Sequence, residues 1–313
     1  MNRLFSHTLV IGLFSLWARY PHSSPSSAWT RPVVSYQIAA SPMAEMVLLK
    51  GDRFFMGDSL KDGFTDELPV HSVEVGSFWI DKFEITFELF DSFCIVTDRA
   101  KPADEGWGRD KYPVIHVTWY DAIRFCNWRS EQEGLQLCYS LEQINPANDP
   151  LAKPITVVTC NWAANGYRLP TEAEWEFAAR KSNTQSRFAN GSMIAAPEEL
   201  NFDGSPAMQL PYVKTWIGRR QTVNIGSLPS AGNSGIYDMS GNVAEWCWDY
   251  YSATYYTSSK MMEPCGPSQG KMRCVRGGSW RDSAKGCRVS SRSYLNPLNK
   301  SNTCGFRCVR RSN

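Results

Sequence analysis

The chain has 313 residues, of which 42% are hydrophobic and 20% are charged, a composition typical of a folded globular protein and unlike that of a disordered one. Its 33 basic and 31 acidic residues give a net charge of +2, which argues against nucleic acid as a partner. With 12 Trp, 13 Tyr and 15 Phe, we expect an irregular fold pinned by large aromatic side chains rather than by long helices.

The first 28 residues are predicted to be a signal peptide for export. Arg3 gives a positive start, residues 9–18 form an apolar run too short to span a bilayer, and residues 26–28 (Ser-Ser-Ala) suit cleavage. The alternatives are an uncleaved membrane anchor and a misassigned start. Residues 29–44 are interpreted as a linker. We therefore expect a periplasmic, secreted or surface protein whose only membrane contact is through this signal segment.

Four short strands are predicted at the start of the folded domain. Apolar or alternating runs lie at residues 46–49, 54–57, 70–75 and 78–80, a pattern that favours partly buried strands. The polar residues 58–67 between the second and third runs predict a loop.

Three short helices are predicted from their start signals, a Thr at the N-cap in each case. The helices, with the capping residue in brackets, are expected at 87–96 (Thr86), 119–131 (Thr118) and 172–180 (Thr171). Residues 181–234 show no periodicity and contain turn sequences, which predicts a long ordered loop. Short apolar runs between turns follow from Gly235 onward. Few short helices among many strands and loops indicate an α+β fold.

Four sequence motifs follow one another along the chain. They are Met56-Gly57 with residues 66–71 (DELPVH); residues 165–176 (NGYRLPTEAEWE); residues 235–246 (GIYDMSGNVAEW); and residues 276–280 (RGGSW) closing with 305–308 (GFRC). In this combination the chain resembles the formylglycine-generating enzyme (sulfatase-modifying factor) family over residues 45–311. The resemblance implies a C-type-lectin-like fold with short strands, three short helices and much irregular ordered loop.

Residues 238–245 are the expected metal site. Asp238 and Glu245 place two carboxylates seven residues apart, and Gly241 allows a sharp turn that lets oxygens converge. Ca²⁺ prefers six to eight oxygen ligands. The resemblance implies a structural calcium ion held by Asp238 and Glu245 together with backbone oxygens of Gly241 and Val243. The alternative is an Asp-capped turn with Glu245 in a salt bridge. With four His and no paired spacing, a His-built metal site is not expected.

The cysteines bear on whether the chain is an oxidase. The resemblance implies that active members bind Cu(I) through two thiols separated by four residues, shortly after the GGS segment, and use O₂ to oxidise a substrate cysteine to formylglycine. This chain has only Cys287 there, and no two of its ten cysteines have that spacing. The candidate catalytic residues are Cys287, Ser279, Trp280 and Arg292.

The remaining cysteines leave disulfides, buried free thiols and a copper or redox pair as alternatives. The resemblance places Cys308 at a position that is disulfide-bonded in some relatives. The partner position falls at Ala178 or Ala179 in this chain, so a bond from Cys308 has to run elsewhere.

Two functions are compatible with these residues. The first is a protein- or peptide-binding scaffold, or a modifying protein of another kind, without cysteine-to-formylglycine activity; its binding loops would be residues 181–234 and 251–270. The second is an O₂- and copper-dependent oxidoreductase that modifies a sulfatase-type protein or a peptide in a groove lined by Ser279, Trp280, Arg292 and Arg307. Because the paired thiols are missing, we expect the first.

Overall fold

The computed structural model describes residues 45–144, 155–180, 185–208, 210–214, 216–229 and 235–312. All of the described residues belong to one unit of the chain. The predicted signal peptide and linker lie outside the described residues. Within the described part, no helix combines the length and apolar character needed to cross a membrane.

All three predicted helices are present. They are α1 (Phe87–Val96), α2 (Trp119–Gln132) and α3 (Glu172–Arg180). The side chains of Thr86 and Thr118 accept backbone N–H bonds at the starts of α1 and α2, because a helix N-terminus leaves its first N–H groups without intrahelical partners. At α3 the Thr171 hydroxyl accepts the N–H of Glu174 at 3.1 Å, and the Glu174 carboxylate accepts the N–H of Thr171 at 2.9 Å. Local capping chemistry therefore fixes where each helix begins.

Twelve strands form two larger sheets and two smaller ones within the described residues. The first sheet has the order β1 (Met46–Leu49), β4 (Phe78–Asp81), β12 (Val309–Arg311) and β7 (Tyr167–Arg168). The second has the order β10 (Arg292–Leu295), β9 (Arg273–Arg276), β8 (Ala244–Tyr250) and β11 (Cys304–Gly305). The two antiparallel pairs are β2 (Asp52–Met56) with β3 (His71–Val75), and β5 (Tyr139–Ile144) with β6 (Ile155–Cys160). Short 3₁₀ turns lie at Thr65–Glu67, Pro206–Met208 and Tyr255–Thr257.

The predicted strands at the start of the domain match β1 to β4 to within one or two residues. The sequence analysis missed β5 and β6. β5 (YSLEQI) is mostly exposed and gives no clear apolar pattern, whereas β6 (ITVVTC) is rich in β-branched residues, a strand signal that was overlooked. The α+β class is confirmed.

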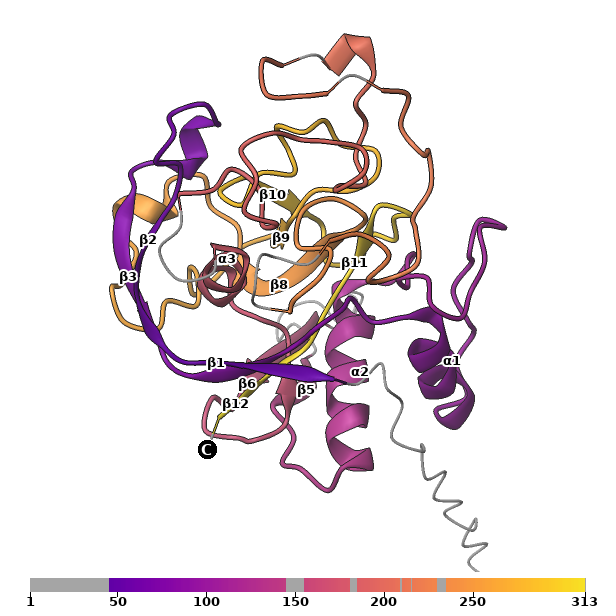
Figure 1. The fold of residues 1–313 in the computed structure, drawn as a ribbon. Helices are drawn as coiled ribbons and strands as arrows, with labels where there is room; N and C mark the ends of the chain where they lie inside the picture. Colours follow the sequence, from indigo (N-terminus) through magenta and orange to yellow (C-terminus); the bar gives the residue numbers. More distant parts are fainter. Residues whose placement is uncertain are drawn as a thin grey trace, which may run out of the picture. The chain divides into compact units, whose positions relative to one another are not determined.

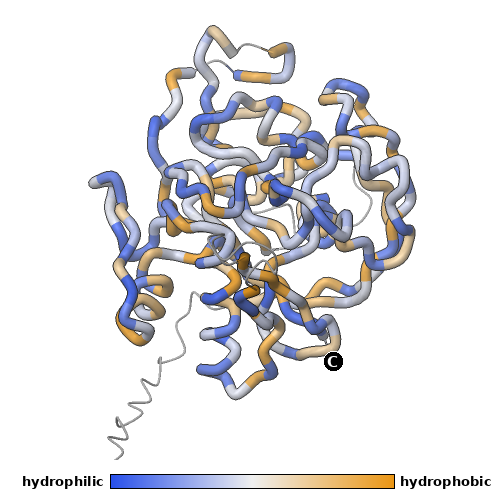
Figure 2. The backbone as a smooth tube through the Cα atoms, turned by 180° about the vertical axis from the view of Figure 1, so that it is seen from behind, coloured by the Kyte–Doolittle hydropathy of each residue, from blue (hydrophilic) through white to orange (hydrophobic). Residues whose placement is uncertain are grey.

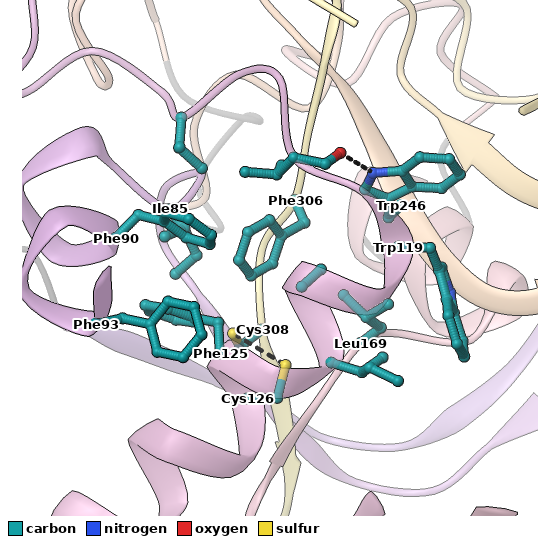
Figure 3. Packing of buried hydrophobic residues seen from close by; sticks show 14 of the residues in the cluster. Ile85, Phe90, Phe93, Trp119, Phe125, Cys126, Leu169, Trp246, Phe306 and Cys308 are labelled. Carbon is teal, nitrogen blue, oxygen red and sulfur yellow. Dashed lines mark hydrogen bonds between the residues drawn. The ribbon is translucent and has the colours of Figure 1, made fainter. Parts of the chain in front are cut away.

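Helix α3 lies at the centre of the fold, between the β2–β3 pair and the strands β8 and β9 (Figure 1). One apolar cluster surrounds α1 and α2, where the ring of Phe125 packs against Phe90 and Phe306 at centroid distances of 5.7 and 5.4 Å (Figure 3). A second cluster surrounds α3 and includes the fully buried Trp175. Hydrophobic and hydrophilic residues alternate over short distances along the backbone (Figure 2). Aromatic packing between short elements thus replaces long helices, as the composition predicts.

Candidate functional site

The segment after β9 forms a tight turn that holds two of the predicted site residues. Gly277 and Gly278 have φ values of 93° and 66°, which side chains disfavour. The buried Ser279 donates its hydroxyl to the carboxylate of Asp282 at 2.6 Å, and its backbone N–H donates to the same carboxylate at 2.9 Å. Trp280 donates its indole N–H to the carbonyl of Asn302 at 2.9 Å. The hydroxyl of Ser279 is therefore engaged within the turn.

Cys287 lies against this turn and is fully buried. Its Sγ is 3.8 Å from the carbonyl oxygen of Ser279. Burial, and next the charge of Asp282, raise the pKa of the Cys287 thiol well above its usual range. The thiolate is the form that binds metals and attacks substrates, so this environment opposes both roles.

Asp282 is a residue of this site that the sequence analysis missed. Four residues separate it from Cys287, which is the spacing expected between two copper-binding thiols. Asp282 therefore stands where the first of the two cysteines would be. The structure brings Ser279, Asp282 and Cys287 together around one turn. Checking which residue occupies the position of the missing cysteine, five positions before Cys287, would have identified Asp282.

Arg292, the fourth candidate, pairs with α3. Its Nε and Nη2 donate to the two carboxylate oxygens of Glu172 at 2.8 and 3.0 Å, and its Nη1 donates to the carbonyls of Asp66 and Ser252 at 2.8 and 3.1 Å. Arg276 also donates to Glu172, at 3.1 Å. Burial alone would raise the pKa of Glu172, but Arg292 and Arg276 outweigh it and lower that pKa. All the charged ends are enclosed, so Arg292 holds the fold together; a catalytic role for it stays a prediction that this burial does not favour.

Residues 238–245, the predicted calcium site, border a buried acidic cluster. Both carboxylate oxygens of Glu245 accept bonds at 2.7 Å from Arg307, and one of them also accepts the indole N–H of Trp175 at 2.8 Å. Glu245 is therefore in a salt bridge, the alternative that its sequence left open. One lone pair on its Oε1 remains for a further partner.

Asp238 differs from Glu245 because one of its oxygens has no partner. Its Oδ2 accepts the N–H of Gly226 at 2.8 Å, whereas its Oδ1 is buried without a hydrogen bond. Burial raises the pKa of Asp238 to about 6. Glu84, a second residue that the sequence analysis missed, accepts two bonds from the Asn242 amide at 3.1 and 3.2 Å. Burial, followed by the charge of Asp238, raises the pKa of Glu84 well above its usual range.

Three buried carboxylates thus face a single guanidinium, that of Arg307, and would carry an excess of negative charge if all three were ionised. No three His, Cys, Asp or Glu side chains of the described residues converge closely enough to hold a metal ion by themselves. A cation here would need backbone oxygens as well, such as those of Gly241 and Val243 that the family resemblance implies. The oxygen donors and the unpartnered Asp238 Oδ1 fit a hard cation such as calcium.

A cavity of about 560 Å³ lies away from these residues. None of Ser279, Trp280, Cys287 and Arg292 lines it. Its walls include Trp162, Arg168, Glu174, Glu263, Cys265 and Arg311. Arg168 donates to both carboxylate oxygens of Glu174 at 2.6 Å, and its guanidinium lies 5.2 Å from the ring centre of Trp162. The volume is in the range of pockets that take small ligands or single side chains of a partner.

All ten cysteines are free thiols in the structure, and eight of them are buried. Cys160 and Cys265 are the two that are partly exposed, and Cys265 lines the cavity. Burial raises the pKa of Cys160 to about 12. The predicted disulfides are therefore not formed in the structure and remain a prediction.

Known proteins resemble this chain along most of its length. The sulfatase-modifying factor enzyme 1-like domain family matches residues 18–312. The chaperone protein LppX of Paenibacillus barcinonensis is 34% identical over 79% of this chain and 82% of its own length. The formylglycine-generating enzyme of Streptomyces coelicolor is 31% identical over 84% of this chain and 88% of its own length.

Larger proteins and solved structures match as well. The chain spans only 38% of the serine/threonine-protein kinase Pkn1 of Chlamydia trachomatis, to which it is 30% identical over 86% of its own length. Treponema denticola variable protein 1 superimposes with a TM-score of 0.65 at 26% identity, over 85% of this chain and 95% of that one. The chain belongs to the sulfatase-modifying factor enzyme 1-like family, the family of the formylglycine-generating enzymes.

Proposed function

We propose that this chain is a formylglycine-generating-enzyme-like domain that binds a protein or peptide partner and does not convert cysteine to formylglycine. The observation that carries the proposal is that Asp282 and Cys287 occupy the two positions at which paired cysteines are expected. At the spacing where two thiols would hold Cu(I), the chain offers one carboxylate and one thiol. Cu(I) is a soft cation that prefers sulfur ligands, whereas carboxylates suit hard cations.

The surroundings of both residues support this reading. The Cys287 thiol is fully buried and its pKa is raised, so it is held in the neutral form that ligates copper poorly. The Asp282 carboxylate already accepts two bonds from Ser279. Neither group is left free to collect a metal ion and a substrate thiol together.

The cavity beside Trp162 supports a binding role. Trp162 is 39% exposed, and large aromatic side chains with a charged rim are typical anchors of protein interfaces. Glu263 and Cys265 line the cavity from residues 251–270, one of the two loops that the sequence analysis predicts for binding. Arg311 adds a positive group to the same rim. A peptide with an apolar side chain and a nearby charge suits these walls.

The names of the relatives include a protein that acts on other proteins without a stated reaction and an enzyme that generates formylglycine. The Paenibacillus relative is named a chaperone, and the Streptomyces relative is named for generating formylglycine. The likeness to the second favours the alternative function, a copper- and O₂-dependent oxidoreductase that acts on a protein or peptide. The residues at positions 282 and 287 weigh against it.

We also propose that calcium stabilises the acidic cluster and that the chain is exported. Asp238 would be the first ligand, since its buried Oδ1 has no partner, with Glu245 and the backbone oxygens of Gly241 and Val243 beside it. The bound cation would offset the excess negative charge between Glu84 and Asp238. Residues 1–28 support export through their basic start and apolar run.

Copper titration tests the proposed function. The purified protein and a Cys287→Ala variant are titrated with Cu(I) against a chromogenic competitor. We expect the same copper uptake for both, because Cys287 is not a ligand. An Asp282→Cys variant restores the spacing of paired thiols, and Ser283→Cys serves as its matched control with the wrong spacing. Tight binding of one Cu(I) by the unmodified protein, lost in Cys287→Ala, would contradict the proposal.

A further inference from the structure

Two cysteine sulfurs meet in the apolar core of the domain. The Sγ atoms of Cys126 and Cys308 are 3.7 Å apart, a distance at which sulfur atoms are in contact (Figure 3). Cys126 lies on α2, and Cys308 directly precedes the C-terminal strand β12. Both side chains are fully buried. Segments that are 182 residues apart in sequence therefore place two thiols face to face.

This contact identifies a partner for Cys308, which the sequence analysis leaves without one. The position where some relatives place its partner is alanine here, at Ala178 or Ala179 on α3. The thiol of Cys308 points to α2 instead (Figure 3). All ten cysteines belong to the described residues, and no other two of their sulfurs are in hydrogen-bonding contact.

The surroundings of the pair suit an uncharged bond. The cluster around it is apolar and includes Phe93, Phe125 and Phe306. Burial, and next the neighbouring Cys308, raise the pKa of Cys126 well above its usual range, so a pair of thiolates holding a metal ion is disfavoured. A disulfide buries no charge and leaves no thiol donor in need of an acceptor.

We propose that Cys126 and Cys308 form a disulfide that ties helix α2 to strand β12. In the reaction the two thiols lose two protons and two electrons, one S–S bond forms, and a small-molecule or protein disulfide that accepts the electrons is reduced to two thiols. Because both sulfurs are inaccessible in the folded domain, the oxidant has to reach them before α2 and β12 pack, while the chain folds. The bond then resists reduction until the core opens. This proposal stands independently of the proposed function.

Trypsin separates the two cysteines cleanly, which makes the test direct. Cleavage after Arg124 and Arg129 releases the peptide 125–129 (FCNWR), and cleavage after Arg307 and Arg310 releases the peptide 308–310 (CVR). The full chain is folded in a buffer of reduced and oxidised glutathione, denatured, alkylated without reductant, digested and analysed by mass spectrometry. We expect one linked species, FCNWR joined to CVR, and eight alkylated cysteines, which is ten less the two that are joined.

Stability measurements complete the test with a matched control. Oxidative folding is expected to raise the Tm of the unmodified chain by on the order of 5–10 °C over the reduced chain. The gain should persist in Cys94→Ala, which removes a buried cysteine of α1, and disappear in Cys126→Ala. If Cys126→Ala does not fold, the peptide map of the unmodified chain decides alone. Singly alkylated FCNWR and CVR peptides after oxidative folding, or a bond from either cysteine to Cys138, would overturn the proposal.

Discussion

Replacing Arg292 by Met is expected to destabilise the fold strongly. The change removes two charge-assisted bonds to Glu172 and leaves the carbonyls of Asp66 and Ser252 without this donor. Breaking a buried ion pair from one side costs about 3–5 kcal/mol. Arg276 still contacts Glu172 at 3.1 Å and limits the loss, so we expect the lower end of that range, about 3 kcal/mol.

The loss should also depend on pH. The pKa of Glu172 is lowered in the folded protein, so its ion pairs stabilise the fold above the unfolded-state pKa of about 4.3 and this stabilisation is lost as pH falls through the folded pKa. The Met variant lacks most of this contribution. The difference in unfolding free energy between the two proteins should therefore be largest at pH 7 and shrink towards pH 3.

Urea unfolding followed by tryptophan fluorescence measures both effects. Arg53→Met is the matched control, since Arg53 is 58% exposed in its pair with Glu74 and its loss should change stability by no more than about 0.5 kcal/mol. An Arg292→Met protein as stable as the control at pH 7 would refute the reasoning.

Three further outcomes are expected. Thr118→Ala removes the cap of α2 and should lower the unfolding free energy by about 1 kcal/mol in urea, whereas an unchanged midpoint would contradict the cap. Calcium should raise the Tm of the purified protein, EGTA should reverse the rise, and Asp238→Ala should abolish it; a calcium response that survives in Asp238→Ala would exclude that residue as a ligand. Gly278→Ala should destabilise by more than about 1 kcal/mol, because the residue has φ of 66° and a Cβ would lie 2.8 Å from Cys287 Sγ; calorimetry showing an unchanged Tm would refute this.

Local chemistry made the helices and the first strands predictable. A Thr that caps a helix and a Glu three residues later act within one turn of chain, so the sequence contains the whole signal for α3. The alternation in β3 reports a half-buried strand for the same reason. Strand β5 is mostly exposed and gave no such signal, whereas the β-branched residues of β6 did give one that the sequence analysis overlooked.

The candidate site depended on contacts that sequence spacing does not encode. Glu84 precedes α1 yet approaches Asn242, 158 residues away. The partner of Arg292 is on α3, 120 residues earlier in the chain. Such pairings are set by how the sheets and α3 pack, so charge and residue type alone could not assign them. Asp282 could have been identified from the sequence, because it lies only five positions before Cys287.

Oxidation of a cysteine-containing peptide tests the central claim most directly. The protein is supplied with Cu(I) and incubated in air with a sulfatase-type peptide, and both oxygen consumption and the mass of the peptide are followed. We predict no formylglycine and no oxygen uptake beyond that of the Cys287→Ser variant. Formylglycine made by the unmodified protein and absent with Cys287→Ser would contradict the claim that residues 282 and 287 cannot form a copper oxidase site.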